Sequence, residues 1–119
     1  AKVHEAIVAR ARQADAELLA QLTAPAEMTL IKRMAFWPRL VESAALAYEP
    51  HRIAFYLQEL AADFHSLWNQ GQDQAELRFI LPDAPEKTAA RLAMIQACAT
   101  VIASGLHVLG VEPLEELRA

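Results

Sequence analysis

Cysteine and glycine are scarce in this sequence of 119 residues, which contains one cysteine, Cys98, and three glycines. A single cysteine excludes an internal disulfide and a cysteine-based metal cluster, and it fits a reducing, cytoplasmic location. Three glycines are too few for a chain rich in tight turns, whereas alanine, leucine, glutamate, glutamine and arginine, which favour helices, are abundant. With 55% hydrophobic residues, these features predict one all-α domain with a single core.

The sequence also lacks the surplus of basic residues that nucleic-acid-binding proteins usually carry. Its 11 lysines and arginines are outnumbered by 15 acidic residues, giving a formal net charge of −4. Composition by itself therefore argues against strong affinity for RNA. The acidic balance suits a helical protein-interaction module without RNA binding. A small helical ligand binder is a further alternative, but it would need convergent polar groups, and the sequence shows none.

Motifs for catalysis or metal binding are absent as well. The four histidines, at positions 4, 51, 65 and 107, are far apart and have no carboxylates at metal-ligand spacing. No glycine-rich phosphate loop and no nucleophile elbow occurs. We therefore expect no catalytic residue, no metal site and no cofactor site in this chain.

The spacing of hydrophobic residues predicts a bundle of four to five helices. The first is expected over residues 3–22, and the second from Pro25 or Ala26 to a break near Trp37 that Pro38 imposes. Further helices are expected over 39–47 and 50–70, followed by a polar loop over 69–74 and a short apolar patch over 76–81 that covers the bundle. A last long helix is expected to begin near Pro85.

No charged residue occurs between Leu92 and Val111, so a membrane-spanning helix has to be considered for this segment. The segment contains Gln96 and His107, has no aromatic belt and is not framed by basic clusters, which weakens that interpretation. Its many small residues instead favour a helix at the centre of the bundle, surrounded by the others. We expect no membrane partner.

Three stretches carry a resemblance to a known family. The first contains Phe36-Trp37-Pro38 and then Val41-Glu42-Ser43-Ala44-Ala45; the second begins Glu49-Pro50-His51-Arg52 and ends Phe64-His65-Ser66-Leu67-Trp68-Asn69; the third runs from Ala90-Arg91-Leu92 to Gly105-Leu106-His107-Val108-Leu109-Gly110-Val111-Glu112. In order and separation they resemble the C-terminal, DALR-type anticodon-binding domain of bacterial arginyl-tRNA synthetases, which belong to class Ia. The likeness covers about residues 30–117.

The resemblance implies a single helical anticodon-binding domain over residues 1–119, cut from the C-terminal end of a longer synthetase. The sequence begins Ala1-Lys2-Val3-His4 without an initiator methionine, which fits a piece of a larger chain. The complete enzyme would use ATP to join arginine to its tRNA. Neither catalytic signature of the class, His-Ile-Gly-His or Lys-Met-Ser-Lys-Ser, is present. By resemblance, the partners are tRNA for arginine and the protein's own catalytic domain, and DNA is not among them.

Five positions are candidate RNA contacts. Phe64 and Trp68 are four residues apart on one helix, so both rings can offer stacking faces to unpaired bases. Packing in the core is the preferred interpretation for Phe64, while RNA contact and a cap on the core stand equal for Trp68. Asn69 suits either a base-edge contact or a helix C-cap. Arg91 matches the family's Arg-Leu motif and is expected to contact phosphate, and Leu117 stands where the family usually has a near-terminal methionine.

The family's first helix usually carries a Tyr-x-His-Ala-Arg segment, and residues 1–12 do not reproduce it. No anticodon contact from that aromatic residue can therefore be assigned to this chain. Trp68 in turn stands where a tyrosine is commoner in the family, which keeps a bulky ring at this position.

Overall fold

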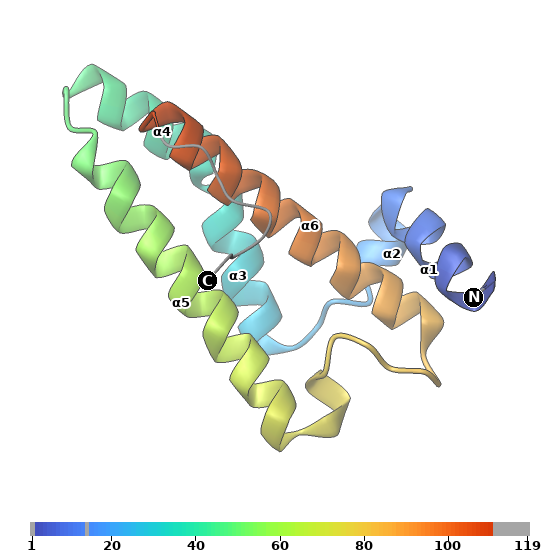
Figure 1. Cartoon of the computed structure of the whole chain (residues 1–119). Helices are drawn as coiled ribbons and strands as arrows, with labels where there is room; N and C mark the ends of the chain where they lie inside the picture. The colour runs from blue at the N-terminus through green and yellow to red at the C-terminus, as the bar shows by residue number, and fades with distance from the viewer. Residues whose placement is uncertain (1, 14, 111–119) are drawn as a thin grey trace, which may run out of the picture.

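The computed structural model describes residues 2–13 and 15–110, and within these residues it is entirely helical (Figure 1). Its elements are α1 (Lys2–Arg12), α2 (Ala16–Leu19), α3 (Pro25–Ala35), α4 (Trp37–Leu46), α5 (His51–Asp73), the 3-10 turn η1 (Ala75–Leu77) and α6 (Pro85–Val108). Because α2 is a single turn, the described chain has five helices of ten residues or more. The prediction of an all-α bundle of four to five helices is confirmed.

The N-terminal region is divided, so the prediction of one helix over residues 3–22 is wrong. Asp15 has extended backbone angles, and its carboxylate accepts a hydrogen bond from the backbone N–H of Leu18 at 2.8 Å. That carboxylate caps α2 and starts a new helix after α1 has ended at Arg12. Leu18 of α2 and Leu22, in the turn that follows it, are buried in the core.

Prolines mark the starts of α3 and α4, and Pro38 lies at the corner between these two helices, as the sequence predicts. Pro25 is the first residue of α3, and Pro38 lies in the first turn of α4, where a missing N–H costs nothing. Tyr56 of α5 holds this corner, because its hydroxyl donates to the carbonyl of Arg33 and its ring stacks on Trp37 with centroids 5.5 Å apart. Burial raises the pKa of the Tyr56 hydroxyl further above neutral pH, where a phenol is a donor in any case.

Helix α5 continues beyond the predicted end at residue 70, so the expected loop over 69–74 is mostly helix. Its C-terminal turn runs to Asp73, and η1 then turns the chain back across the end of α5. After η1, Phe79 inserts its ring into the bundle and is 9% exposed. The expected apolar patch is therefore present, with Phe79 as its anchor.

Helix α6 contacts α1, α2, α3 and α5, so it is the central packing element of the described chain (Figure 1). Its buried side includes Ala89, Ala90, Met94 and Cys98, while Gln96 and Thr100 are exposed on another side. The expectation that the other helices surround it on all sides is therefore too strong. It is long and apolar enough to span a membrane by composition, and one third of its most apolar stretch is buried against the other helices.

One buried ion pair joins α3 to α6. Glu27 and Arg91 are 1% and 2% exposed, and their carboxylate and guanidinium meet through Nη2 and Oε1 at 3.3 Å. Nη1 of Arg91 donates to the carbonyl oxygens of Glu76 at 2.8 Å and Arg78 at 2.6 Å. Three segments that are distant in the sequence therefore meet at one guanidinium.

We expect Glu27→Ala to lower the free energy of unfolding by about 3–5 kcal/mol, because it leaves the buried charge of Arg91 without its counter-ion. The matched control is Glu59→Ala, which removes a carboxylate that is 63% exposed and should cost less than about 1 kcal/mol. Urea unfolding followed by circular dichroism measures both changes. Equal losses in the two variants would show that Glu27 and Arg91 do not hold the fold together.

Tyr48, in the turn between α4 and α5, has a φ of 55° and is 91% exposed. A side chain with a Cβ is strained in this left-handed region, and glycine is not. We expect Tyr48→Gly to raise the free energy of unfolding by up to about 1 kcal/mol. Tyr48→Ala keeps the Cβ and should leave stability unchanged, so a gain of the same size in both variants would exclude backbone strain as the cause.

Candidate nucleic-acid interface

An open groove of about 320 Å³ lies between the C-terminal part of α5, the chain after η1 and one side of α6. We call it the Trp68 groove. Trp68, Gly71 and Gln72 line it from α5, the segment Arg78–Ile80 closes one wall, and Leu92 and Ile95 contribute from α6. The groove thus exists because α5 extends to Asp73 and because the chain after η1 runs back alongside it.

Trp68 is the exposed member of a group of three aromatic rings. It is 49% exposed, and its ring centroid is 5.5 Å from that of Phe79, which is in turn 5.6 Å from that of Phe64. Phe64 is partly buried against the core, in agreement with the preferred interpretation of that residue. Stacking of an RNA base on Phe64 stays a prediction. Trp68 combines both interpretations, because its ring contacts Phe79 and still leaves about half its surface accessible for stacking.

Asn69 lies next to Trp68 on α5 and is exposed. The C-cap interpretation of Asn69 is wrong, because α5 runs on to Asp73 and ends with Gln74 as its C-cap. A base-edge contact by Asn69 stays a prediction. Leu117 lies outside the described residues.

Arg91 does not fit the role of a phosphate contact. It is 2% exposed, and its guanidinium is occupied by Glu27 and by two backbone carbonyls, so no face of it reaches solvent. The Arg-Leu motif that suggested an RNA contact therefore marks a structural residue in this chain. Arg91 acts on the Trp68 groove only through the backbone that it binds, at Glu76 and Arg78.

Arg78 is a cation of the Trp68 groove that the sequence interpretation missed. The residue is exposed, and its Nε donates to the carbonyl oxygen of Gly71 at 3.0 Å. The lining of the groove includes no carboxylate. A signal was present in the sequence, since Arg78 is the only charged residue between Leu77 and Leu81.

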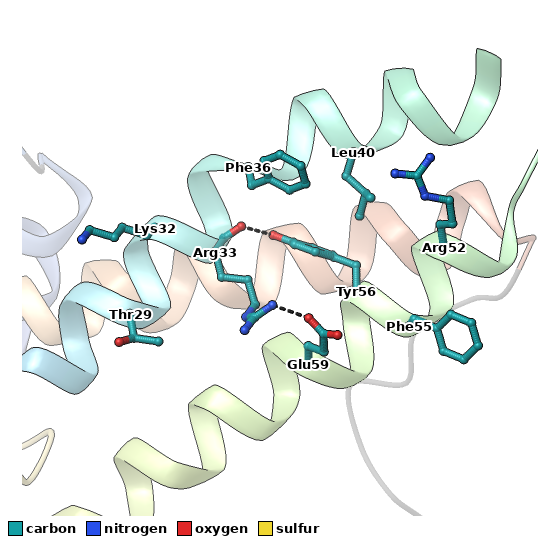
Figure 2. Close-up of a pocket in the computed structure, with 9 residues that line it drawn as sticks. All are labelled: Thr29, Lys32, Arg33, Phe36, Leu40, Arg52, Phe55, Tyr56 and Glu59. Atoms are coloured by element: carbon teal, nitrogen blue, oxygen red, sulfur yellow. Dashed lines mark hydrogen bonds and ion pairs between the residues drawn. The ribbon is translucent and has the colours of Figure 1, made fainter. Parts of the chain in front are cut away.

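A second groove, of about 530 Å³, lies between α3, α4 and α5, and we call it the Arg33 groove. Figure 2 shows the side chain of Arg33 directed toward Glu59, with Phe36 and Phe55 on different sides of the opening. Arg33 pairs with Asp63 and Glu59, and the hydrogen bond that its Nε donates to the Asp63 carboxylate raises the pKa of its guanidinium above the usual value.

Two of the three cations that line the Arg33 groove, Arg33 and Arg52, are paired with carboxylates, while Lys32 is exposed and makes no ion pair among the described residues. Besides the pairs of Arg33, Arg52 donates to the Ser43 hydroxyl at 2.8 Å and lies 3.9 Å from the carboxylate of Glu49. At Arg33 and Arg52 phosphate would have to compete with these carboxylates, and Glu59 lines the same groove as Lys32, whereas the lining of the Trp68 groove around Arg78 includes no acidic residue. The Trp68 groove is therefore the better candidate for RNA.

The described residues include no group of three histidine, cysteine, aspartate or glutamate side chains placed to hold a metal ion. Cys98 is 3% exposed, and burial raises the pKa of its thiol, which disfavours the reactive thiolate. Cys98 therefore serves as a small apolar residue of the core.

Comparison with known proteins identifies close relatives over nearly the whole chain. It is 58% identical over 110 residues to an arginine–tRNA ligase of Rhodospirillum rubrum, covering 92% of this chain and 18% of that protein. It is 63% identical over 97 residues to an arginine–tRNA ligase of Parvibaculum lavamentivorans, covering 82% of this chain and 17% of that protein. With an arginine–tRNA ligase of Rhodopseudomonas palustris the identity is 52% over 114 residues, or 96% of this chain and 19% of the relative.

The chain thus spans less than a fifth of the length of these relatives. No solved structure matches it. The family model of the DALR anticodon binding domain matches residues 2–117, which include all of the helices described above. On this match and on the identity to its relatives, the chain belongs to the DALR anticodon binding domain family.

Proposed function

We propose that this chain recognises the anticodon loop of tRNA for arginine as the anticodon-binding part of an arginine–tRNA ligase. Its family and the names of its relatives support this function. The observation that carries it is the placement of Trp68, which is half-exposed, backed by Phe79 and shares with Arg78 a groove without acidic lining. A large exposed ring beside a cation is the arrangement that binds unpaired nucleotides.

In this proposal an unpaired anticodon base stacks on the exposed part of the Trp68 ring. Phe79 and Phe64 support that ring from the core side, so little side-chain freedom is lost on binding. One stacked base contributes about 1–3 kcal/mol, and a chain with a net charge of −4 can neutralise few phosphates. The isolated chain should therefore bind tRNA weakly, and most of the affinity should come from the rest of the ligase.

Catalysis belongs, in the same proposal, to a separate domain of the ligase. That domain would bind ATP, activate arginine and transfer it to the 3′ end of the tRNA in the cytoplasm, while this chain supplies no reacting group. The two would act as partners on one tRNA. Purified alone, the chain should show no arginine-dependent exchange of pyrophosphate into ATP, and such exchange would refute this division of labour.

We expect Trp68→Ala to weaken binding of an RNA hairpin with an arginine anticodon loop by about 1–3 kcal/mol. The matched control is Phe36→Ala in the Arg33 groove, because Phe36 is 48% exposed, almost the same as Trp68. Fluorescence anisotropy with the full-length ligase measures both dissociation constants. Trp68→Tyr keeps a stacking ring and should restore most of the affinity.

Circular dichroism and thermal unfolding check that the Trp68→Ala protein remains folded. Aminoacylation of the cognate tRNA and of an anticodon variant should then show reduced discrimination in Trp68→Ala. If Trp68→Ala and Phe36→Ala change binding equally, or if the folded Trp68→Ala protein keeps its discrimination, Trp68 serves only as a cap on the core.

A further inference from the structure

The guanidinium of Arg78 is anchored on one side only. Its Nε donates to the carbonyl oxygen of Gly71 at 3.0 Å, and among the described residues no acceptor is bonded to its Nη1 or Nη2. Both terminal nitrogens therefore keep their donors for another partner, and the bond from Nε limits the rotation of the group. An arginine held in this way can present two parallel N–H groups to one oxyanion.

Gly71 allows the backbone of Arg78 to come this close to α5. A Cβ at position 71 would lie 3.2 Å from the carbonyl oxygen of Leu77 and 3.3 Å from the Cα of Arg78. Both are backbone atoms, which cannot rotate away as the end of a side chain can. Any larger residue at position 71 would therefore push the segment that carries Arg78 away from α5 and change the position of its guanidinium.

Arg91 holds the same segment from the α6 side. Its Nη1 donates to the carbonyl oxygen of Arg78 at 2.6 Å and to that of Glu76 at 2.8 Å, while Glu27 neutralises its charge. The backbone of Arg78 is thus fixed between two long helices. Trp68 and Arg78 line one groove, and Phe79, the residue after Arg78, contacts the Trp68 ring.

We infer that Arg78 binds a phosphate of the RNA strand next to the base that stacks on Trp68, and that Gly71 and Arg91 are its positioning residues. The inference rests on the proposed function of the Trp68 groove. Among the groove's lining residues Arg78 alone carries a charge, so the groove offers a single cation to the RNA backbone. A phosphate contact carries no sequence information, so Arg78 adds affinity and Trp68 adds the discrimination.

The test uses the full-length ligase with Arg78→Gln, Arg78→Lys and the control Arg39→Gln. Arg39 is an exposed arginine of α4, so its variant loses the same charge at a site outside the Trp68 groove. The probes are two fluorescent RNA hairpins, one with an arginine anticodon and one with an altered anticodon. Dissociation constants are measured for each protein over a series of KCl concentrations.

Arg78→Gln should weaken binding of both hairpins about tenfold, by the same factor for each. The plot of log affinity against log salt should become less steep by about 0.7, as expected for one lost phosphate contact on a single strand. Arg78→Lys should keep that slope but recover only part of the affinity, since an ammonium group cannot bind bidentately. Arg39→Gln should change neither quantity.

Gly71→Ala tests the positioning role, because it leaves every charge in place. It should weaken binding of both hairpins while the helix content measured by circular dichroism stays unchanged. The salt slope should fall as it does in Arg78→Gln, which a general loss of stability would not produce.

The phosphate role is overturned if Arg78→Gln resembles Arg39→Gln, or if Arg78→Gln weakens only the hairpin with the arginine anticodon, which would make Arg78 a reader of bases. Trp68→Ala separates the two proposals. If it weakens binding while Arg78→Gln does not, only the role of Arg78 fails. If neither variant affects binding, the function proposed for the Trp68 groove fails as well.

Discussion

The fold depends on the burial of one guanidinium. Arg91 carries its charge into a core that is otherwise almost entirely apolar, and it remains there because Glu27 neutralises it and two backbone carbonyls accept its remaining donors. A buried pair of this kind adds little net stability compared with an apolar pair, but either charge left alone is very costly. Its consequence is geometric, because Arg91 keeps all its partners only while α3, α6 and the segment from Glu76 to Arg78 stay together.

An acidic chain can still offer RNA a favourable surface, because the placement of its charges matters more than their sum. Arg33 and Arg52, the arginines of the larger groove, are each paired with carboxylates of α5 or of the turn before it, so their charge serves the fold. Arg78 is bonded to a neutral carbonyl instead and keeps its whole charge available. Arginines therefore stabilise the fold in the Arg33 groove, whereas the arginine of the Trp68 groove remains available to a ligand, and α5 contributes to both grooves.

Much of the fold follows from local rules that the sequence displays. Prolines 25, 38 and 85 each begin or lie near the start of a helix, and the long predicted helix over 50–70 is present as part of α5. Local rules fail where a distant contact decides. Polar residues suggested a loop over 69–74, yet α5 continues to Asp73, and Gly71 in its last turns packs against the backbone of the returning chain. Asp15 divides the first predicted helix for a local reason instead, because its side chain caps α2 three residues further on, a role that hydrophobic spacing alone cannot reveal.

Sequence reasoning was least able to assign the residues of the candidate site. Family resemblance selected Arg91, and the spacing of residues on α5 selected Trp68, but only the packed structure separates a residue that touches the groove from one that supports it. Since Arg91 binds the carbonyl oxygen of Arg78, a change at Arg91 would disturb the groove even though its side chain is buried away from any ligand. A loss of RNA binding on changing Arg91 would therefore not identify a contact. The salt dependence of binding would show only that a phosphate contact is lost, whether directly or because Arg78 is displaced, since counter-ions are released where a cation reaches phosphate.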